Sequence, residues 1–156
     1  MFIICDIDGV LASVTHLLPL IQGENKDFDA YYSRIGEALP IQEGLRIADA
    51  LLFTLYEDGV RDKFHFVTGR SERSRGTTED WLLDNLNWLG FDLHMRSNTD
   101  RRPAHEVKHD IIQRISKETG VPFSEMTVFE DDPQCAKMYE SLGCYVCHVR
   151  HEKAKS

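Results

Sequence analysis

The sequence lacks any apolar run that approaches the roughly 18 residues needed to span a membrane. Its apolar start, residues 2–5, follows no basic leader and ends at once at Asp6, so we expect no signal peptide. Cysteine is scarce, with four residues in the chain, and without a targeting segment this predicts free thiols in a reducing cytosol. We therefore expect a cytoplasmic protein without a membrane anchor.

Positive charge is also in short supply, because 18 Lys and Arg residues face 26 Asp and Glu residues and leave a net charge of −8. This balance argues against a protein that coats nucleic acids, since non-specific binding depends on neutralising phosphates with Lys and Arg. Arginines nevertheless gather in two groups, Arg70, Arg73 and Arg75, and Arg96, Arg101 and Arg102. Both groups could lie in solvated loops, but we favour a patch that binds an anionic substrate, because they flank the motifs described below.

Internal repeats, low-complexity tracts and Gly/Ser linkers are absent, and 156 residues fit a single domain. Short apolar runs alternate instead with segments whose apolar residues recur at helical spacing. The predicted strands are residues 2–5, 64–67, 92–95, 126–129 and 145–149, and the predicted helices are residues 41–56, 78–89, 103–120 and 133–143. This alternation is typical of a parallel sheet with helices on both faces, so we predict a three-layer α/β/α, Rossmann-like fold with a mainly parallel sheet.

The segment at residues 11–40 does not fit this alternation. It is polar in its middle and predicts one short helix near residues 28–39. Ligands of parallel α/β sheets bind beyond the carboxyl ends of the strands. We therefore predict that residues 11–40 form a small cap that lies over those ends and covers the active site.

Four polar motifs stand at the ends of predicted strands or on the helix beside them. They are Asp6-Ile7-Asp8-Gly9-Val10, Thr68-Gly69-Arg70, Lys108 and Glu130-Asp131-Asp132. Because parallel strands end at the same edge of a sheet, we expect these residues on one rim. Carboxylates from separate strands repel one another unless a cation lies among them, and a small cluster of oxygen ligands suits Mg²⁺.

These residue types meet the requirements of phosphoryl transfer, in which positioning and electrostatics supply most of the catalysis. Asp6 can attack phosphorus in line and form an acyl phosphate. Asp8 can protonate the leaving oxygen and then deprotonate the attacking water. Thr68, with its hydroxyl and a nearby backbone N–H, and Lys108, with its positive charge, can stabilise the phosphoryl oxygens.

Each motif also has an ordinary structural explanation when it is taken alone. Asp-x-Asp-Gly can form a turn, Thr-Gly is common in loops, and Asp131-Asp132 can cap a helix. Lys108 could be a solvated lysine, although Ile111 and Ile115 place it on the apolar stripe of its helix. All four motifs in this order, each at a strand end or on the right helix, favour the catalytic interpretation.

In these motifs and their order, the sequence resembles the haloacid dehalogenase (HAD) superfamily of phosphohydrolases. The resemblance covers nearly the whole chain and implies that Asp6 is the nucleophile and Asp8 the general acid and base. It implies that Thr68 and Lys108 bind the phosphoryl group. Asp8 favours phosphate-ester chemistry, because the dehalogenases lack this second acid.

The same resemblance implies a Mg²⁺ ion bound by Asp6, the carbonyl of Asp8 and one acid of the pair Glu130-Asp131. We favour Asp131 as the direct ligand, with Glu130 behind it. No obligate protein partner is expected.

A closer resemblance is to the phosphatase domain of bacteriophage polynucleotide kinases and their stand-alone relatives. The matching segments are residues 27–32, 78–82, 94–96, 100–103 and 106–108. The resemblance implies removal of 3′-phosphates from nucleic-acid ends, with Gly69, Arg70, Arg101 and Arg102 expected to bind substrate. The chain contains no G-x-x-x-x-G-K-[ST] loop, so we expect no kinase half.

A free 5′-nucleotide is the main alternative substrate. Leu17 stands where the relatives commonly carry a substrate-binding Arg, Ala104 where they often have Asp, and Val10 where Thr is frequent. Leu17 and the acidic net charge favour the free nucleotide, whereas the matching segments and the arginine groups favour the nucleic-acid end, which we prefer.

Two other classes of protein carry similar residues. A phospho-signalling receiver domain also gathers acids, Thr and Lys around Mg²⁺, but its phosphorylated Asp follows a later strand. A non-catalytic module that binds phosphorylated ligands is disfavoured because Asp6, Asp8 and the other motif residues are retained.

Two further features leave more than one interpretation. Cys144 and Cys147, with His148 and His151 nearby, could suggest zinc or a redox pair. We do not predict either, because a second C-x-x-C is missing and residues i and i+3 of a strand point to opposite faces. The aromatic pair at residues 31–32 could stack on a nucleobase or pack the cap.

Overall fold

A parallel five-stranded sheet forms the centre of the computed structural model, which describes residues 1–60, 63–86 and 92–151. The strand order is β5-β4-β1-β6-β7, and every neighbouring pair is parallel. The strands are β1 (Phe2–Cys5), β4 (Phe64–Ser71), β5 (Asp92–Arg96), β6 (Met126–Glu130) and β7 (Tyr145–His148). The predicted α/β fold with a mainly parallel sheet is confirmed.

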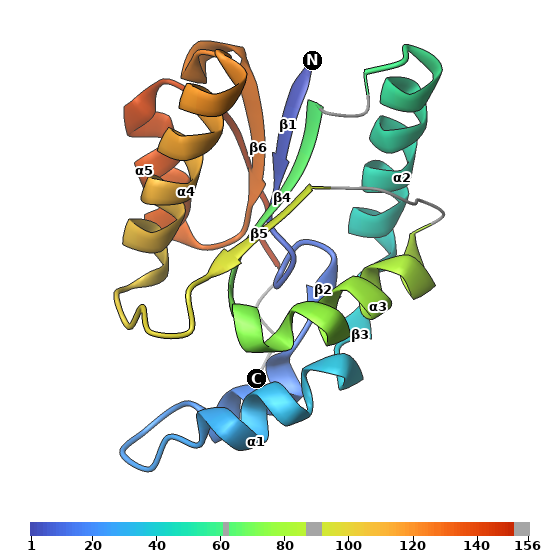
Figure 1. Cartoon of the computed structure of the whole chain (residues 1–156). Coiled ribbons are helices and arrows are strands. Elements are labelled where there is room, and N and C mark those ends of the chain that lie inside the picture. The colour runs from blue at the N-terminus through green and yellow to red at the C-terminus, as the bar shows by residue number, and fades with distance from the viewer. Residues whose placement is uncertain (61–62, 87–91, 152–156) are drawn as a thin grey trace.

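Helices cover both faces of this sheet (Figure 1). They are α2 (Gln42–Glu57) and α3 (Arg75–Asn85) on one side, and α4 (Ala104–Thr119) and α5 (Pro133–Leu142) on the other. Asp132 caps α5 by accepting a hydrogen bond from the Cys135 amide at 2.8 Å. Gly120 and Gly143 end α4 and α5 in the left-handed conformation, as their positions predicted.

Alternation along β1 divides its side chains between two apolar cores. Ile3 and Cys5 pack into the core on the α2 side, whereas Phe2 and Ile4 pack into the core beneath α4 and α5. Cys5 therefore faces the core, as expected from its place before Asp6. Among the residues that the structure places, no helix has the length and apolar character of a membrane span.

Some element boundaries differ from the predictions. Strand β4 continues to Ser71 after a register shift that follows Val67, so Thr68-Gly69-Arg70, which was predicted to follow the strand, lies within it. Helix α3 begins and ends earlier than the predicted 78–89, and the predicted part from residue 87 onward lies outside the described residues. Helix α4 begins at Ala104, one residue after the predicted start at Pro103.

The segment at residues 11–40 forms a small insert at the carboxyl ends of the strands (Figure 1). Its elements are β2 (Ala12–Ser13) and β3 (Leu39–Pro40), which pair antiparallel, the 3₁₀ helices Thr15–Leu20 and Ile35–Glu37, and α1 (Phe28–Ser33). Side chains tie the insert to α3 and to β4. Trp81 Nε1 donates to the Ala38 carbonyl at 2.8 Å, and the Tyr32 hydroxyl accepts from the Ser71 amide at 3.2 Å.

Candidate active site

Three carboxylates from two neighbouring strands meet at the carboxyl edge of the sheet. Asp6 follows β1, and its amide donates to the Phe129 carbonyl of β6 at 3.0 Å, which continues the pairing of the two strands. This register brings Asp6 beside Glu130 and Asp131. Carboxylate oxygens of all three lie within 4.8 Å of one another. The sequence prediction of an acidic rim is thus reproduced by the geometry.

The side chain of Lys108, on α4, extends into this cluster. Its Nζ lies 3.0 Å from Asp6 Oδ1 and 2.7 Å from Glu130 Oε2, and the residue is only 3% exposed. Burial alone would lower the pKa of the ammonium, but Asp6 and Glu130 outweigh burial and raise this pKa well above its usual value. Lys108 is therefore a fixed, buried cation and not a solvated lysine.

Asp6 and Asp131 both have raised pKa values, because each is at least partly buried and lies close to another carboxylate. Burial, and then the charge of Glu130, raise the pKa of Asp6, while Lys108 partly opposes the rise. Burial and the charge of Asp6 raise the pKa of Asp131 to about 6. One lysine does not balance the three carboxylates of the cluster, so negative charge remains in excess. Oxygen ligands with excess negative charge suit a hard divalent cation such as Mg²⁺.

Glu130 differs from its two neighbours in having both oxygens engaged. Oε2 accepts from Lys108, and Oε1 accepts from the amide of Asp132 at 3.1 Å. It is also 1% exposed. Although Glu130 lies within the cluster by distance, Asp6 and Asp131 are the acids with oxygens left for a metal ion.

Gly9 allows the loop after β1, which carries Asp6 and Asp8, to contact Asp131. Its φ is +85°, and a Cβ atom at this position would lie 1.9 Å from Asp131 Oδ2. Its amide donates to the Ala12 carbonyl at 2.8 Å and closes a tight turn. The close approach and the left-handed backbone both require glycine.

Asp8 is held by Arg70 of β4. Arg70 Nη2 lies 2.6 Å from Asp8 Oδ1, and its Nε lies 3.0 Å from Oδ2. The same guanidinium donates to Thr78 Oγ1 at 3.2 Å, and Arg70 is 2% exposed. The sequence suggested Arg70 as a substrate-binding residue, but in the structure its guanidinium faces Asp8 and Thr78.

Thr68 and Gly69 occupy the last part of β4, next to Asp6 and Asp8. Thr68 is 1% exposed, and its hydroxyl accepts from the Arg70 amide at 3.1 Å. The Gly69 carbonyl accepts from Arg96 Nε at 2.9 Å. This hydrogen bond from Arg96 therefore stabilises the backbone of β4 at Gly69.

A cleft of about 650 Å³ opens above these residues, a size suited to a small organic ligand. Its floor includes Asp6, Asp8, Thr68, Gly69, Lys108 and Asp131, and the insert contributes Ser13, Val14, Thr15 and Leu18. The insert thus lines the same cleft as the motif residues.

The predicted substrate residues Arg101 and Arg102 are exposed and lie outside the lining of this cleft. Arg102 forms ion pairs with Asp100 and Asp110, each at 2.8 Å. Arg101 forms no ion pair within the described part of the chain. Of the two, Arg101 is the one whose guanidinium is available to a ligand.

Sequence reasoning missed how the insert is fastened beside the site. Arg73 lies 4.5 Å above the Tyr32 ring and forms an ion pair with Asp29 at 2.5 Å. Tyr31 is 6% exposed and packs edge-on against Tyr32 at 5.1 Å. These rings contribute to the packing of the insert. The run of aromatic and acidic residues at 27–32 was the available signal, but it did not identify Arg73.

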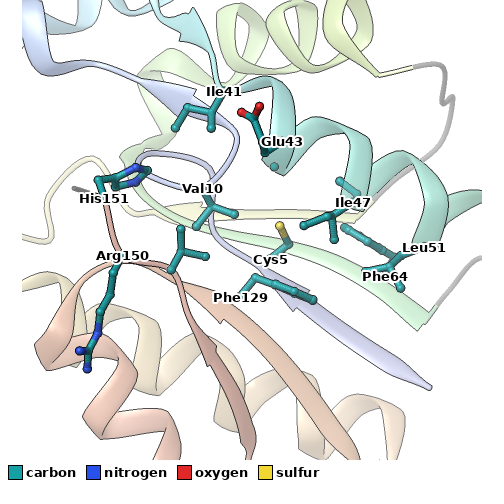
Figure 2. A pocket seen from close by; sticks show the side chains of 13 residues that line it. Cys5, Val10, Ile41, Glu43, Ile47, Leu51, Phe64, Phe129, Arg150 and His151 are labelled. Atoms are coloured by element: carbon teal, nitrogen blue, oxygen red, sulfur yellow. The ribbon is translucent and has the colours of Figure 1, made fainter.

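A second pocket of about 270 Å³ lies between α2 and the sheet (Figure 2). Its walls are mainly apolar and include Val10, Ile47 and Phe129. None of the motif carboxylates lines it. His151 and Ile41 border both this pocket and the catalytic cleft, so the two spaces lie back to back.

Comparison with protein families gives one match over nearly the whole chain. The model of the polynucleotide kinase PNKP phosphatase domain, a HAD family, matches residues 1–153. No curated protein matches the sequence.

Solved structures share the fold at low sequence identity. The Pnkp1/Rnl/Hen1 complex contains a chain that is 21% identical, with a TM-score of 0.66 over 96% of this chain and 45% of that one. A HAD hydrolase of family IA, variant 3, from Entamoeba histolytica HM-1:IMSS is 17% identical, with a TM-score of 0.63 over 93% and 82% of the chains. The HAD family enzyme bt-2542 from Bacteroides thetaiotaomicron, solved with magnesium and inorganic phosphate, is 13% identical, with a TM-score of 0.50 over 94% and 92%. The present chain therefore spans less than half the length of the chain that it matches in the Pnkp1/Rnl/Hen1 complex.

Proposed function

The chain belongs to the family of polynucleotide kinase phosphatase domains within the HAD superfamily, and from this membership we propose a Mg²⁺-dependent phosphatase that removes 3′-phosphates from nucleic-acid ends. That the protein is a HAD-type phosphatase follows from the family match. The single observation that supports the mechanism is the cluster of Asp6, Lys108 and Asp131 on one rim.

In the first step, a carboxylate oxygen of Asp6 attacks phosphorus, and the bond from phosphorus to the leaving oxygen breaks. The leaving oxygen takes a proton from Asp8, and Asp6 carries an acyl phosphate. Asp6 and Asp131 would hold Mg²⁺, whose charge would offset that of the phosphoryl oxygens and let the anionic carboxylate approach phosphorus. Lys108 holds Asp6 in place at 3.0 Å.

In the second step, Asp8 takes a proton from water while the water oxygen attacks phosphorus. The bond between Asp6 and phosphorus breaks, which releases inorganic phosphate and restores the free carboxylate. In this proposal the Thr68 hydroxyl and the backbone amide of Gly69, both residues of the cleft lining, donate hydrogen bonds to the phosphoryl oxygens.

Arg70 acts through Asp8 in this proposal. Its guanidinium is buried and fully directed to Asp8 and Thr78, so it fixes the direction of the Asp8 carboxylate. A bidentate contact of this kind restrains both position and rotation. We therefore infer that Arg70 is a positioning residue and not a substrate ligand.

The family match supports a nucleic-acid end as substrate, and Arg101 supports it from the surface. Arg101 is exposed and follows β5 on the side where the strands end. A cation outside the cleft suits a polymer whose terminal phosphate enters the cleft while the next phosphates stay outside.

A free nucleotide is favoured by a different observation. Within the described residues, the cleft lining contains one Lys or Arg, and this residue, Lys108, is already paired with Asp6 and Glu130. Leu17 is fully buried in the core, so position 17 presents no group to a substrate. The interior of the cleft therefore offers no further lysine or arginine for a second phosphate.

A phosphate-release panel separates these substrates. It compares a 3′-phosphorylated oligonucleotide with 3′-mononucleotides, 5′-mononucleotides and a sugar phosphate. We expect the highest kcat/KM for the oligonucleotide, with the purified chain alone and with Mg²⁺. A preference for 5′-mononucleotides would replace the proposal by the alternative, and a need for an added protein would contradict activity without a partner. The cytoplasmic location stays a prediction.

Two variants sharpen the panel. Arg101→Gln is expected to raise KM for the oligonucleotide and to leave KM for a mononucleotide unchanged. Arg102→Gln is the matched control, because the Arg102 guanidinium is occupied by Asp100 and Asp110. Equal KM values for the oligonucleotide in wild type and Arg101→Gln would remove Arg101 from the substrate site.

A further inference from the structure

Two histidines near the end of β7 contact the backbones of the two acidic loops. His148 Nε2 lies 3.1 Å from the Asp131 carbonyl oxygen. His151 Nε2 lies 2.5 Å from the Gly9 carbonyl oxygen. A carbonyl oxygen can only accept, so each Nε2 carries the hydrogen and donates it.

The two loops that receive these hydrogen bonds touch each other at one point. Asp131 Oδ2 occupies the space in which a Cβ atom of Gly9 would lie, at 1.9 Å. Gly9 directly follows Asp8, and Asp131 is, with Asp6, one of the two acids with oxygens left for a metal ion. The contact between the loops therefore sets where Asp131 stands relative to Asp6 and Asp8.

The strand pairing explains how both histidines reach the rim. His148 is in register with Glu130, and the Val149 amide donates to the Glu130 carbonyl at 2.8 Å, which extends the pairing of β7 with β6 past the strand end. Beyond β7 the chain brings His151 to the loop that carries Gly9 and Val10 (Figure 2). One short segment thus contacts both loops, although Gly9 and His151 are 142 positions apart.

We propose that His148 and His151 are positioning residues that hold the two acidic loops at the separation needed to bind Mg²⁺. Neither histidine touches the reacting atoms. His148 fixes the carbonyl of Asp131, and His151 fixes the carbonyl of Gly9, the residue after Asp8, whose own carbonyl is expected to bind Mg²⁺. Groups that orient metal ligands commonly change metal affinity or activity by about 10- to 100-fold when they are removed. The inference rests on the proposed Mg²⁺-dependent phosphatase.

Replacing each histidine by Leu and by Gln tests the proposal. Leu removes the donor, whereas the Gln amide nitrogen can lie near the position of Nε2. We expect His148→Leu and His151→Leu to weaken Mg²⁺ binding by about tenfold or more, measured by titration calorimetry with Mg²⁺ alone. The Mg²⁺ concentration for half-maximal hydrolysis of p-nitrophenyl phosphate should rise equally, and KM for that substrate at saturating Mg²⁺ should not. The Gln variants should recover most of the affinity.

The matched control is His109→Leu, a partly exposed histidine on α4 that contacts neither loop. All variants are first compared by thermal unfolding in EDTA. His148 is half-buried and its Leu variant could fail to fold, but the exposed His151 lies beyond the last strand and keeps the test decisive. Folded His151→Leu with wild-type Mg²⁺ affinity would overturn the proposal. Wild-type protein that neither binds Mg²⁺ nor hydrolyses the ester would instead overturn the proposed function.

Discussion

Arg70 and Asp8, 62 positions apart in the chain, form a two-point ion pair beneath the catalytic cleft, with Nη2 2.6 Å from Oδ1 and Nε 3.0 Å from Oδ2. Side-chain exposure is 1% for the arginine and 25% for the aspartate. The arginine is thus hidden, while part of the carboxylate remains open to the cleft. In the proposed mechanism, Arg70 orients the carboxylate of Asp8, the group that transfers the proton.

Arg70→Lys keeps the charge but loses the two-point contact. We expect kcat for p-nitrophenyl phosphate to fall by about 10²-fold, the lower end of what general acid and base catalysis contributes. KM should change little. Steady-state kinetics check this, with Thr78→Val as a milder variant that removes one acceptor of Arg70. A large rise in KM with constant kcat would show that Arg70 binds substrate after all.

Lys108→Met leaves Asp6 and Glu130 buried side by side without their cation. Breaking a buried ion pair by removing one partner costs about 3–5 kcal/mol, so we expect a loss of this size in the free energy of unfolding without Mg²⁺. Urea denaturation measures it, and the exposed Lys137→Met serves as the control. A loss no greater than that of the control would contradict the buried-cation interpretation. Catalysis should be lost as well.

The raised pKa of Asp131 gives the Mg²⁺-free protein a pH dependence. The folded protein holds the proton up to a pKa of about 6, compared with an ordinary value of 3.8. This carboxyl therefore favours the folded state below pH 3.8, and its contribution is lost as the pH rises to 6. Unfolding in EDTA at pH 4 and pH 7 should show a smaller loss of stability for Asp131→Asn than for wild type. Equal losses would place the pKa of Asp131 near its ordinary value.

Mg²⁺ affinity is expected to rise with pH, whereas the contribution of Asp131 to stability falls, because the metal requires deprotonated carboxylates. Affinity should rise as the pH passes 6. Calorimetry at pH 5 and pH 7 checks this direction.

Gly9→Ala should weaken Mg²⁺ binding in addition to the stability lost by placing alanine in a left-handed backbone. Gly9 and Gly23 both have positive φ, at +85° and +78°, but a Cβ at Gly23 meets nothing within 4 Å. Gly23→Ala is thus expected to cost only about 1–2 kcal/mol for the left-handed backbone. Gly9→Ala must also displace Asp131, so its Mg²⁺ affinity should fall while that of Gly23→Ala is unchanged. Equal affinities would contradict the close approach of the two loops.

Much of the fold was predictable because local patterns agree with tertiary packing. The apolar run at residues 2–5 became a buried strand, and Gly120 and Gly143 ended helices where left-handed caps were expected. Boundaries were harder. Strand β4 continues through Thr68-Gly69-Arg70 because β5 pairs with it again at Ser71, a contact that depends on a distant strand.

In the candidate site, too, some features were predictable from the sequence and others were not. The position of Lys108 on an apolar stripe anticipated its burial, and the acids at the ends of β1 and β6 anticipated the cluster. The partner of Arg70 could not be read from the sequence, because an arginine beside a phosphate-binding motif looks the same whether it faces a ligand or an aspartate. The contacts of His148 and His151 depend on the order of strands in the sheet, in which β6 lies between β1 and β7, and the sequence alone does not give this order.

The central claim is that Asp6 carries the phosphoryl group during turnover. The direct measurement is to quench the enzyme with acid during hydrolysis, reduce the product with borohydride, and locate homoserine by peptide mass spectrometry. An acyl phosphate on Asp6 predicts homoserine at position 6, dependent on substrate and Mg²⁺ and absent from Asp6→Asn, which should be inactive yet folded. Undiminished hydrolysis by Asp6→Asn, or homoserine at another acid, would contradict the account.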